Sequence, residues 1–253
     1  MHILIYDGSF EGFLTAVFEL YEYKLAPVQI VKESAPLPLL FINAKIVITD
    51  RVKAERVFTK LNAIIGKKGI HQLLCSILTE KDDCEIHLLN VIRYVLKNPN
   101  DNVLQNMADP SVLKLAQQVK MIGREKHRME AFVRFKLTCD DIYFSEIEPD
   151  FNVLPLILSH FKQRYQDQKW LIFDQKRHYG IFYDLQTVEY VEMDFNELKN
   201  SRAGLEMLAK DEELYQSLWK TYFKSTNIKA RKNTRLHLQH VPKRYWKYLT
   251  EKV

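Results

Sequence analysis

The first apolar positions of the chain predict a strand followed by a helix. Ile3–Tyr6 alternates weakly, as a half-buried strand does. Apolar side chains then recur at helical spacing over residues 13–21. Asp7 or Ser9 stands before this pattern and is a suitable N-cap. The chain therefore begins with a strand–turn–helix unit.

Further strands and helices complete an N-terminal α/β pattern. β-branched runs at Val28–Lys32 and Lys45–Thr49 predict two strands. Asp50 is the expected cap of a helix that reaches about Ile65. Additional helical patterns lie near residues 69–79, 83–97 and 111–130.

The middle of the chain has a different pattern, typical of a hairpin, a helix and a meander. Phe132–Leu137 and Ile142–Ile147 alternate on either side of a Cys-Asp-Asp turn, which predicts a β-hairpin. A helical pattern covers Asn152–Gln166. Three short strands are expected at residues 170–173, 179–183 and 188–191. The short connections favour an antiparallel sheet.

A last helix, with Leu214, Leu218 and Tyr222 spaced four apart, precedes the C-terminal segment. The whole pattern predicts an α+β fold, in which an N-terminal α/β lobe packs on an antiparallel β-hairpin–helix–β-meander lobe with a helical basic C-terminus. A composition shift near residues 110–120 divides the chain into 1–115 and 116–253. A single domain is the alternative, because no linker is visible.

Composition indicates a globular protein of a reducing compartment. Hydrophobic residues make up 47% and charged residues 27% of 253 positions, an ordinary globular balance. The odd number of cysteines, without a CxxC pair, argues against a disulfide framework. The start of the chain does not resemble a signal peptide, and no stretch is apolar enough to cross a membrane. We therefore expect a cytoplasmic protein without membrane contact.

The distribution of charge points to a polyanionic partner. Residues 219–253 contain ten Lys or Arg and one acidic residue, a charge of +9, whereas residues 1–218 carry −4. Clustered cations neutralise phosphates, and exposed aromatic rings can stack on bases. The alternative is a solvated charged face with its aromatics in the core, which we favour for Trp219 and Tyr222. The nucleic-acid candidates in this segment are Arg231, Lys232, Asn233, Arg235, Lys243, Arg244, Tyr245 and Trp246.

Two further basic clusters are candidates for the same role. Arg124, His127 and Arg128 share one face of a predicted helix, and Arg134 follows it. They can form a phosphate clamp or, equally, an ion-pair lattice such as Glu130 with Arg134. Arg177 lies in a charged turn between two strands, where contact with a partner and a simple turn are both reasonable interpretations.

Catalytic and metal-binding patterns are weak. The chain lacks Walker A, GxGxxG, GxSxG and HExxH motifs. The spacing His71-x3-Cys75 and Cys84-x2-His87 allows zinc, but single thiols on helices are more often core residues. Carboxylates at 146, 148 and 150 follow a strand and can act as acid or base, or cap the next helix. We predict neither a cofactor nor a metal, and leave catalysis open.

Four strings in the sequence resemble the DUF4130 family. They are GREKHRMEAFVRF at 123–135, EPDFNVLPLILSHFKQRY at 148–165, W-x3-D-x2-R-x-YG at 170–180 and RKN…VPKRYWKYL at 231–249. The opening YDGSFEGFLTAVFELY is also similar to the start of family members. The matching polar and aromatic residues are Arg124, Glu125, His127, Arg128, Arg134, His160, Arg164, Trp170, Asp174, Arg177, Arg231, Asn233, Pro242, Arg244, Tyr245 and Trp246.

The resemblance implies a role in DNA metabolism or repair, and Arg164 of the matching strings joins the nucleic-acid candidates. Family members are typically encoded beside a radical-SAM protein similar to spore photoproduct lyase, and some relatives are fused to a uracil-DNA-glycosylase-like domain. Because this chain lacks CxxxCxxC, an iron–sulfur cluster would belong to the partner. The expected function is a DNA-binding accessory protein. The alternatives are a glycosylase-like enzyme and a protein-docking scaffold.

Overall fold

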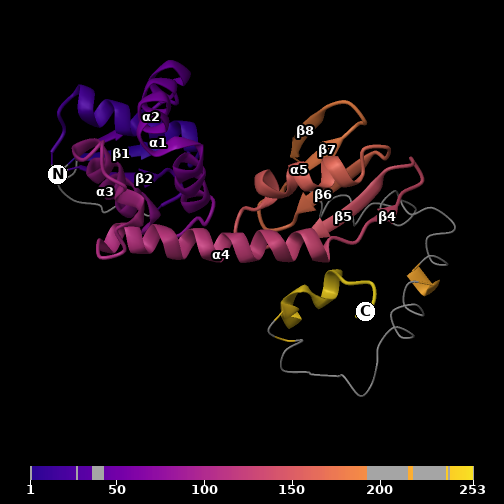
Figure 1. Ribbon diagram of the computed structural model, residues 1–253. Coiled ribbons are helices and arrows are strands. Elements are labelled where there is room, and N and C mark those ends of the chain that lie inside the picture. Colours follow the sequence, from indigo (N-terminus) through magenta and orange to yellow (C-terminus); the bar gives the residue numbers. More distant parts are fainter. Residues whose placement is uncertain are drawn as a thin grey trace. The chain divides into compact units, whose positions relative to one another are not determined.

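The chain folds into two compact units, residues 1–123 and 124–253. This computed structural model describes residues 2–26, 28–35, 43–192, 216–218, 238 and 240–252 (Figure 1). Helix α4, Pro110–Phe132, runs through the division between the units. The elements form an α+β protein, as the sequence pattern predicts.

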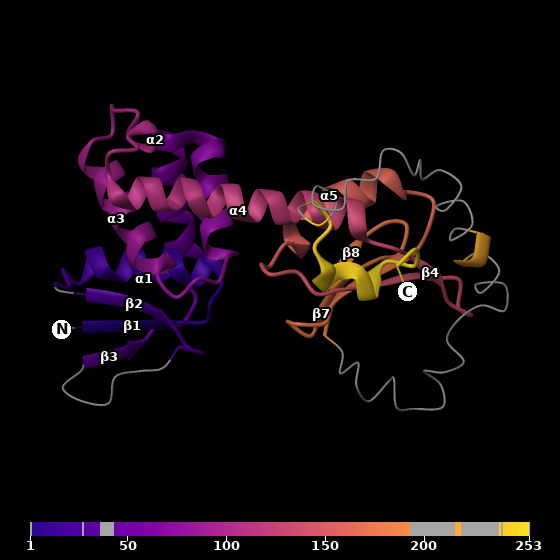
Figure 2. The same ribbon diagram turned by 90° about the horizontal axis from the view of Figure 1, so that it is seen from below.

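The N-terminal unit is built on a three-stranded parallel sheet. Its strands are β1 (His2–Tyr6), β2 (Val28–Lys32) and β3 (Asn43–Ile46), in the order β2-β1-β3 (Figure 2). Helix α1, Phe10–Glu22, connects β1 to the parallel strand β2. The strand predicted at 45–49 lies earlier in the chain, at Asn43–Ile46, so that residues 47–49 are not strand.

The first two helices begin at polar N-cap residues that the sequence pattern offered as candidates. The Ser9 hydroxyl accepts a hydrogen bond from the Gly12 N–H, and the Asp50 carboxylate accepts from the N–H groups of Val52 and Lys53. Helix α2, Arg51–Ile77, joins the two predicted helices at 50–65 and 69–79 through a kink at Gly66, whose φ is 66°. Its length therefore reflects two helices meeting at a glycine.

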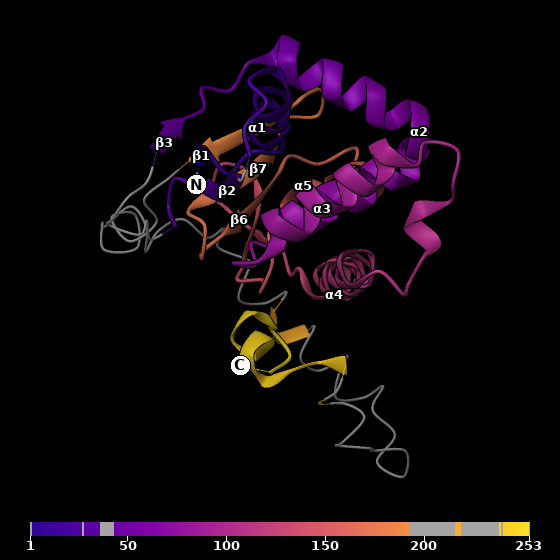
Figure 3. The same cartoon turned by 90° about the vertical axis from the view of Figure 1, so that its left-hand side faces the viewer.

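Helix packing completes the N-terminal unit. Helix α1 lies against α2, and α2 contacts α3, Cys84–Lys97 (Figure 3). A short 3-10 helix, η1, covers Val103–Gln105. The apolar faces form one core that includes Phe13, Leu61 and Leu73.

The C-terminal unit contains a mixed five-stranded sheet. Its strands are β4 (Lys136–Leu137), β5 (Tyr143–Ile147), β6 (Trp170–Asp174), β7 (Tyr179–Tyr183) and β8 (Val188–Glu192), in sequential order. Neighbours are antiparallel except β5 and β6, which are parallel. The expectation of a fully antiparallel sheet is therefore wrong.

The crossover through α5, Leu154–Arg164, explains the parallel pair. A helix that returns the chain along the sheet lets the next strand run in the same direction as the last. Two smaller expectations also fail. Residues 132–135 are not strand, because α4 continues to Phe132. The N-cap of α5 is Val153, which has no side-chain hydrogen bond as a cap.

A second core fills the C-terminal unit. Trp170, Ile172 and Ile181 from the sheet are fully buried, as is Ile157 of α5. A final 3-10 helix, η3, covers Lys243–Tyr248. The predicted helix around Leu214–Tyr222 lies mostly outside the described residues.

Candidate nucleic-acid interface

The C-terminal segment, defined here as residues 240–252, is held on its unit by Tyr245. This side chain is buried, and its ring centre lies 5.6 Å from that of Phe132. Its hydroxyl donates a hydrogen bond to Glu125 of α4. Burial, followed by this hydrogen bond, raises the pKa of the Tyr245 hydroxyl. The prediction of Tyr245 as a surface aromatic is corrected, because its ring completes the core of the unit.

Glu125 is the acceptor at the centre of this attachment. Its carboxylate is 1% exposed and also accepts the Asp150 N–H at 2.9 Å. Arg128 Nη1 lies 3.3 Å away, and Arg244 Nη2 lies 3.9 Å away. The structure thus brings Arg128 and Arg244 together, but around a buried carboxylate that needs their charge. Arg128 is half-buried, whereas Arg124, one turn earlier on the same helix, is exposed.

Acidic residues after β5 bind the same segment. Asp150 pairs with Arg244 at 2.5 Å. Glu148 accepts hydrogen bonds from the Lys247 ammonium and, at 2.6 Å, from the Tyr248 hydroxyl. The hydrogen bond from Lys247 holds the pKa of Glu148 below its ordinary value. Glu148 and Asp150 therefore neutralise part of the positive charge of the C-terminal segment, and they do not cap α5.

Arg134 also contacts the end of the chain. Its Nη2 and Nε lie 2.8 and 3.2 Å from the two carboxylate oxygens of Glu251. This is the bidentate geometry typical of an arginine–carboxylate pair. Glu130, the partner considered from sequence, binds Lys126 at 2.5 Å. The ion-pair interpretation of this cluster is thus correct for several of its members.

Arg177 supports a turn within the sheet. Its Nη1 lies 2.7 Å from the Asp174 carboxylate and 3.2 Å from the Pro149 carbonyl, and its Nη2 reaches the Asp150 carbonyl at 3.2 Å. Asp174 is fully buried, and this burial raises its pKa against the pull of Arg177. Because the guanidinium faces inward, we leave Arg177 out of the interface.

Other predicted residues are exposed. Arg124 and His127 lie on α4, where the His127 side chain is 87% exposed. Lys243 and Arg164 are exposed at the start of η3 and the end of α5. Trp246 is half-buried, and its indole N–H donates to the Val241 carbonyl at 3.1 Å. Arg231, Lys232, Asn233 and Arg235 lie outside the described residues.

A cavity of about 760 Å³ in the C-terminal unit brings together two of the predicted arginines, Arg134 and Arg164. Its other lining residues come from α4, the β4–β5 hairpin, α5, the connections next to these elements, residue 216 and the C-terminal segment. They are Glu130, Ala131, Val133, Phe135, Leu137, Tyr143, Phe161, Tyr165, Gln168, Gln216 and Thr250. Its volume lies within the roughly 300–1,000 Å³ of small-ligand sites.

Aromatic rings form a corner in this cavity. The Phe135 ring is nearly perpendicular to those of Phe161 and Tyr165, at centroid distances of 5.8 and 5.3 Å. The Phe161 and Tyr165 rings are almost parallel, with an interplanar angle of 9°. Sequence analysis did not select these rings, although the i,i+4 spacing of Phe161 and Tyr165 was an available signal.

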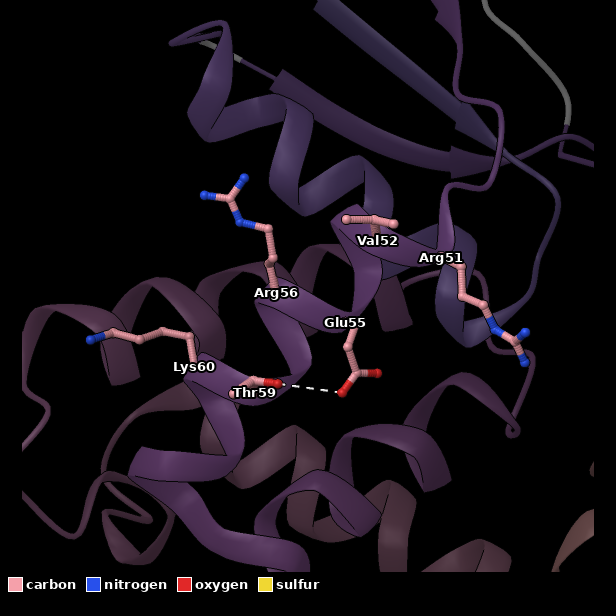
Figure 4. Close-up of a pocket in the computed structure, with 6 residues that line it drawn as sticks. All are labelled: Arg51, Val52, Glu55, Arg56, Thr59 and Lys60. Atoms are coloured by element: carbon pink, nitrogen blue, oxygen red, sulfur yellow. Dashed lines mark hydrogen bonds between the residues drawn. The ribbon is translucent and has the colours of Figure 1, made fainter.

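A second hollow lies on α2 of the N-terminal unit (Figure 4). Arg56 and Lys60 extend on one side of the helix, whereas Arg51 extends on the other. Glu55 accepts a hydrogen bond from Thr59 at 3.4 Å. The cations do not converge, so this surface is a charged helix face and a useful control for the cavity.

The histidine–cysteine pairs do not form a metal centre. His71 Nε2 lies 3.5 Å from Cys75 Sγ, whereas the buried Cys84 thiol donates to Glu85 at 3.1 Å. Burial raises the pKa of the Cys84 thiol, which disfavours the thiolate that a metal needs. Within the described ranges, no group of three His, Cys, Asp or Glu could hold a metal ion. Nor is any described helix long and apolar enough to cross a membrane.

These features define a class: an α+β protein whose C-terminal unit has an aromatic cavity with two arginines in its lining. Sequence comparison then assigns the chain to a family. The chain belongs to the DUF4130 family, because that family's model, described as a domain of unknown function, matches residues 82–251. The similarity of the opening segment lies outside this match. No curated protein matches the chain.

Proposed function

We propose that this protein binds DNA and acts as an accessory protein in DNA repair or modification, together with a radical-SAM partner. The observation that carries the proposal is the cavity, where the exposed Arg164 lies among aromatic rings and Arg134 is paired with Glu251. Cations and aromatic rings in one site are the combination that recognises phosphate and base together. The family resemblance supports DNA as the polyanion.

Exposed cations extend the binding surface. Arg124 and His127 on α4 and Lys243 at the start of η3 are open to solvent and belong to the same unit as the cavity. Arg128, Arg134 and Arg244 contribute less, because they balance Glu125, Glu251 and Asp150. Neutralising phosphates releases counterions, so the affinity should fall as salt rises.

The test measures DNA affinity over a salt series for the full chain. Replacing Arg124 and Arg164 with Ala should lower the affinity and flatten the salt dependence, by about 0.9 in log–log slope per lost duplex phosphate contact, or about 0.7 on a single strand. Arg56→Ala with Lys60→Ala removes the same charge from α2 and should have a smaller effect. A wild-type protein that binds no DNA at low salt would refute the proposal.

The partner is tested separately. Co-purification of a radical-SAM protein similar to spore photoproduct lyase should persist after nuclease treatment if the two proteins touch directly. Co-purification that nuclease abolishes would show that DNA alone joins them. Persistent co-purification without any DNA affinity would favour the scaffold function instead.

One observation favours an enzymatic alternative. Glu130 lines the cavity, and its carboxylate lies 3.9 Å from His127 Nδ1 and 4.0 Å from His160 Nδ1. A carboxylate flanked by imidazoles can act as a general base on water. Base release from lesion-bearing DNA by the isolated protein, abolished by Glu130→Gln, would support it. The absence of product with any lesion tested would leave the accessory role.

A further inference from the structure

The cavity, of about 760 Å³, has the volume of a small-ligand site and is lined by partly exposed aromatic rings. Phe135, Tyr143 and Tyr165 are only half-buried, although they belong to one aromatic cluster. The Phe135 and Tyr165 rings meet edge to face at 78°, so a planar ligand that stacks on one ring lies roughly edge-on to the other. Offset stacked and edge-to-face contacts are the favoured aromatic geometries.

Positive charge lies at the same place. The Arg164 guanidinium carbon lies over the Tyr165 ring, 5.8 Å from its centre, on an exposed side chain. Arg134 is partly exposed and pairs with Glu251. A ligand that places a ring on Tyr165 would therefore bring its attached anionic group close to a guanidinium, which suits phosphate bidentately.

The polar lining disfavours an aliphatic occupant. Glu130, Gln168 and Gln216 supply carboxylate and amide groups to the cavity. An aliphatic side chain would cover these groups without hydrogen bonds, at a cost in free energy. The edge of a base carries donors and acceptors that amides can match.

We propose that this cavity receives a single unstacked nucleobase of a DNA strand, with the base on the Tyr165 ring and the adjoining phosphate at Arg164. This inference rests on the proposed DNA-binding function and specifies its substrate form. The protein then prefers single-stranded or locally opened DNA, because a paired base is not available to stack on a side chain.

The test uses the full chain and a short oligothymidylate that contains one 2-aminopurine. Binding should change the 2-aminopurine fluorescence, and single strands should bind more tightly than a duplex of equal length at the same salt. Tyr165→Leu keeps an apolar side chain but removes the ring, and should lower single-strand affinity roughly 5- to 150-fold, as expected for one stacked base. Tyr165→Phe should retain the affinity.

Tyr190→Ala is the matched control, because Tyr190 is an exposed tyrosine of β8 that does not line the cavity. Circular dichroism shows whether each variant is folded. If Tyr165→Leu unfolds, the test instead compares two DNA strands on the wild-type protein. An oligonucleotide of abasic sites should bind 5- to 150-fold more weakly than oligothymidylate.

Equal affinity for the abasic and base-bearing strands would overturn the inference. So would a Tyr165→Leu variant that is folded and binds single strands like the wild type. In both cases, salt-dependent DNA binding would still stand, so that the proposed function survives. Competition by an aromatic peptide but not by nucleotides would identify a protein partner as the occupant instead.

Discussion

Glu125 carries several of the contacts that attach the C-terminal segment to its unit. A buried carboxylate is costly unless cations and hydrogen-bond donors surround it. Here the donors are the Tyr245 hydroxyl, the Asp150 N–H and Arg128, with Arg244 nearby. The side chain of one helix residue thus helps to position Arg244 and Tyr245.

At the residue scale, Tyr245→Phe should lower the free energy of unfolding by about 1–3 kcal/mol. The ring still fills its place beside Phe132, but Glu125 loses one donor in a buried site. Chemical denaturation measures the change. Tyr179→Phe is a useful comparison, because its hydroxyl donates to an amide oxygen of Asn152 and not to a buried carboxylate. An equal or larger loss in Tyr179→Phe would contradict the special role of Glu125.

Arg177 and Arg124 should differ in what their loss affects. Arg177→Ala leaves the fully buried Asp174 without its cation and should cost about 3–5 kcal/mol of stability. Arg124→Ala removes an exposed charge and should change stability by less than about 0.5 kcal/mol. Thermal denaturation of both variants checks this. A stable Arg177→Ala protein would show that the turn does not depend on the pair.

At the element scale, two glycines in helices should respond to alanine in opposite directions. Gly66 has φ 66° and ψ 176°, a conformation essentially restricted to glycine, so Gly66→Ala should cost about 1–3 kcal/mol. Gly123 lies inside α4, and Gly123→Ala should stabilise by about 0.5–1 kcal/mol. Neither added methyl meets an atom within 4 Å, so the backbone alone sets the sign. Denaturation midpoints measure both effects, and the same sign in both would refute this explanation.

The attachment of η3 should weaken in acid. Because its partners hold the pKa of Glu148 below the ordinary 4.5, this carboxylate contributes stability above that pH and loses it as the pH falls through the folded value. Glu148→Gln should therefore be less stable than the wild type near neutral pH, by less than about 1 kcal/mol for this exposed pair. The difference should vanish in acid.

Denaturation of both proteins across pH tests this dependence. Glu189→Gln, an exposed acid of β8, is the control and should show no such trend. A difference between Glu148→Gln and the wild type that stays constant with pH would exclude the ion pair as its source.

At the scale of the whole molecule, the two units have separate cores. Leu73 is buried in the N-terminal unit and Ile172 in the C-terminal unit. Leu73→Ala or Ile172→Ala should each cost about 2–5 kcal/mol. Hydrogen exchange should show the loss of protection mainly in the unit that carries the change. Equal loss in both units would indicate one cooperative fold.

The local pattern of apolar and polar residues was sufficient to predict most of the described helices and strands, and several of the residues at which they begin. Asp50 was predicted as a cap and Ser9 was one of two candidates, and both side chains accept the N–H hydrogen bonds of the first helical turn. This information is local, because a cap and its donors lie within three residues of each other. Among the described residues of the N-terminal unit, periodicity likewise predicted the helices, apart from the joining of two patterns at Gly66 and the short η1.

The candidate site was only partly predictable. Charge and family strings selected Arg134 and Arg164, which both line the cavity. The same signals selected Arg177 and Tyr245, which face inward. Composition shows which charged and aromatic side chains are present, but not which carboxylate each of them contacts. Glu125, for example, binds Tyr245 across 120 residues of sequence.

The sequence alone determined the α+β class, the element order, the excess of charge at the C-terminus and the family. Tertiary structure decided the parallel pairing of β5 with β6, the inward orientation of Tyr245, and the meeting of Phe135, Tyr165 and Arg164 in one cavity. Short-range periodicity encodes which face of an element is buried. Which charges and rings meet depends on contacts between distant segments, and these form only when the chain folds.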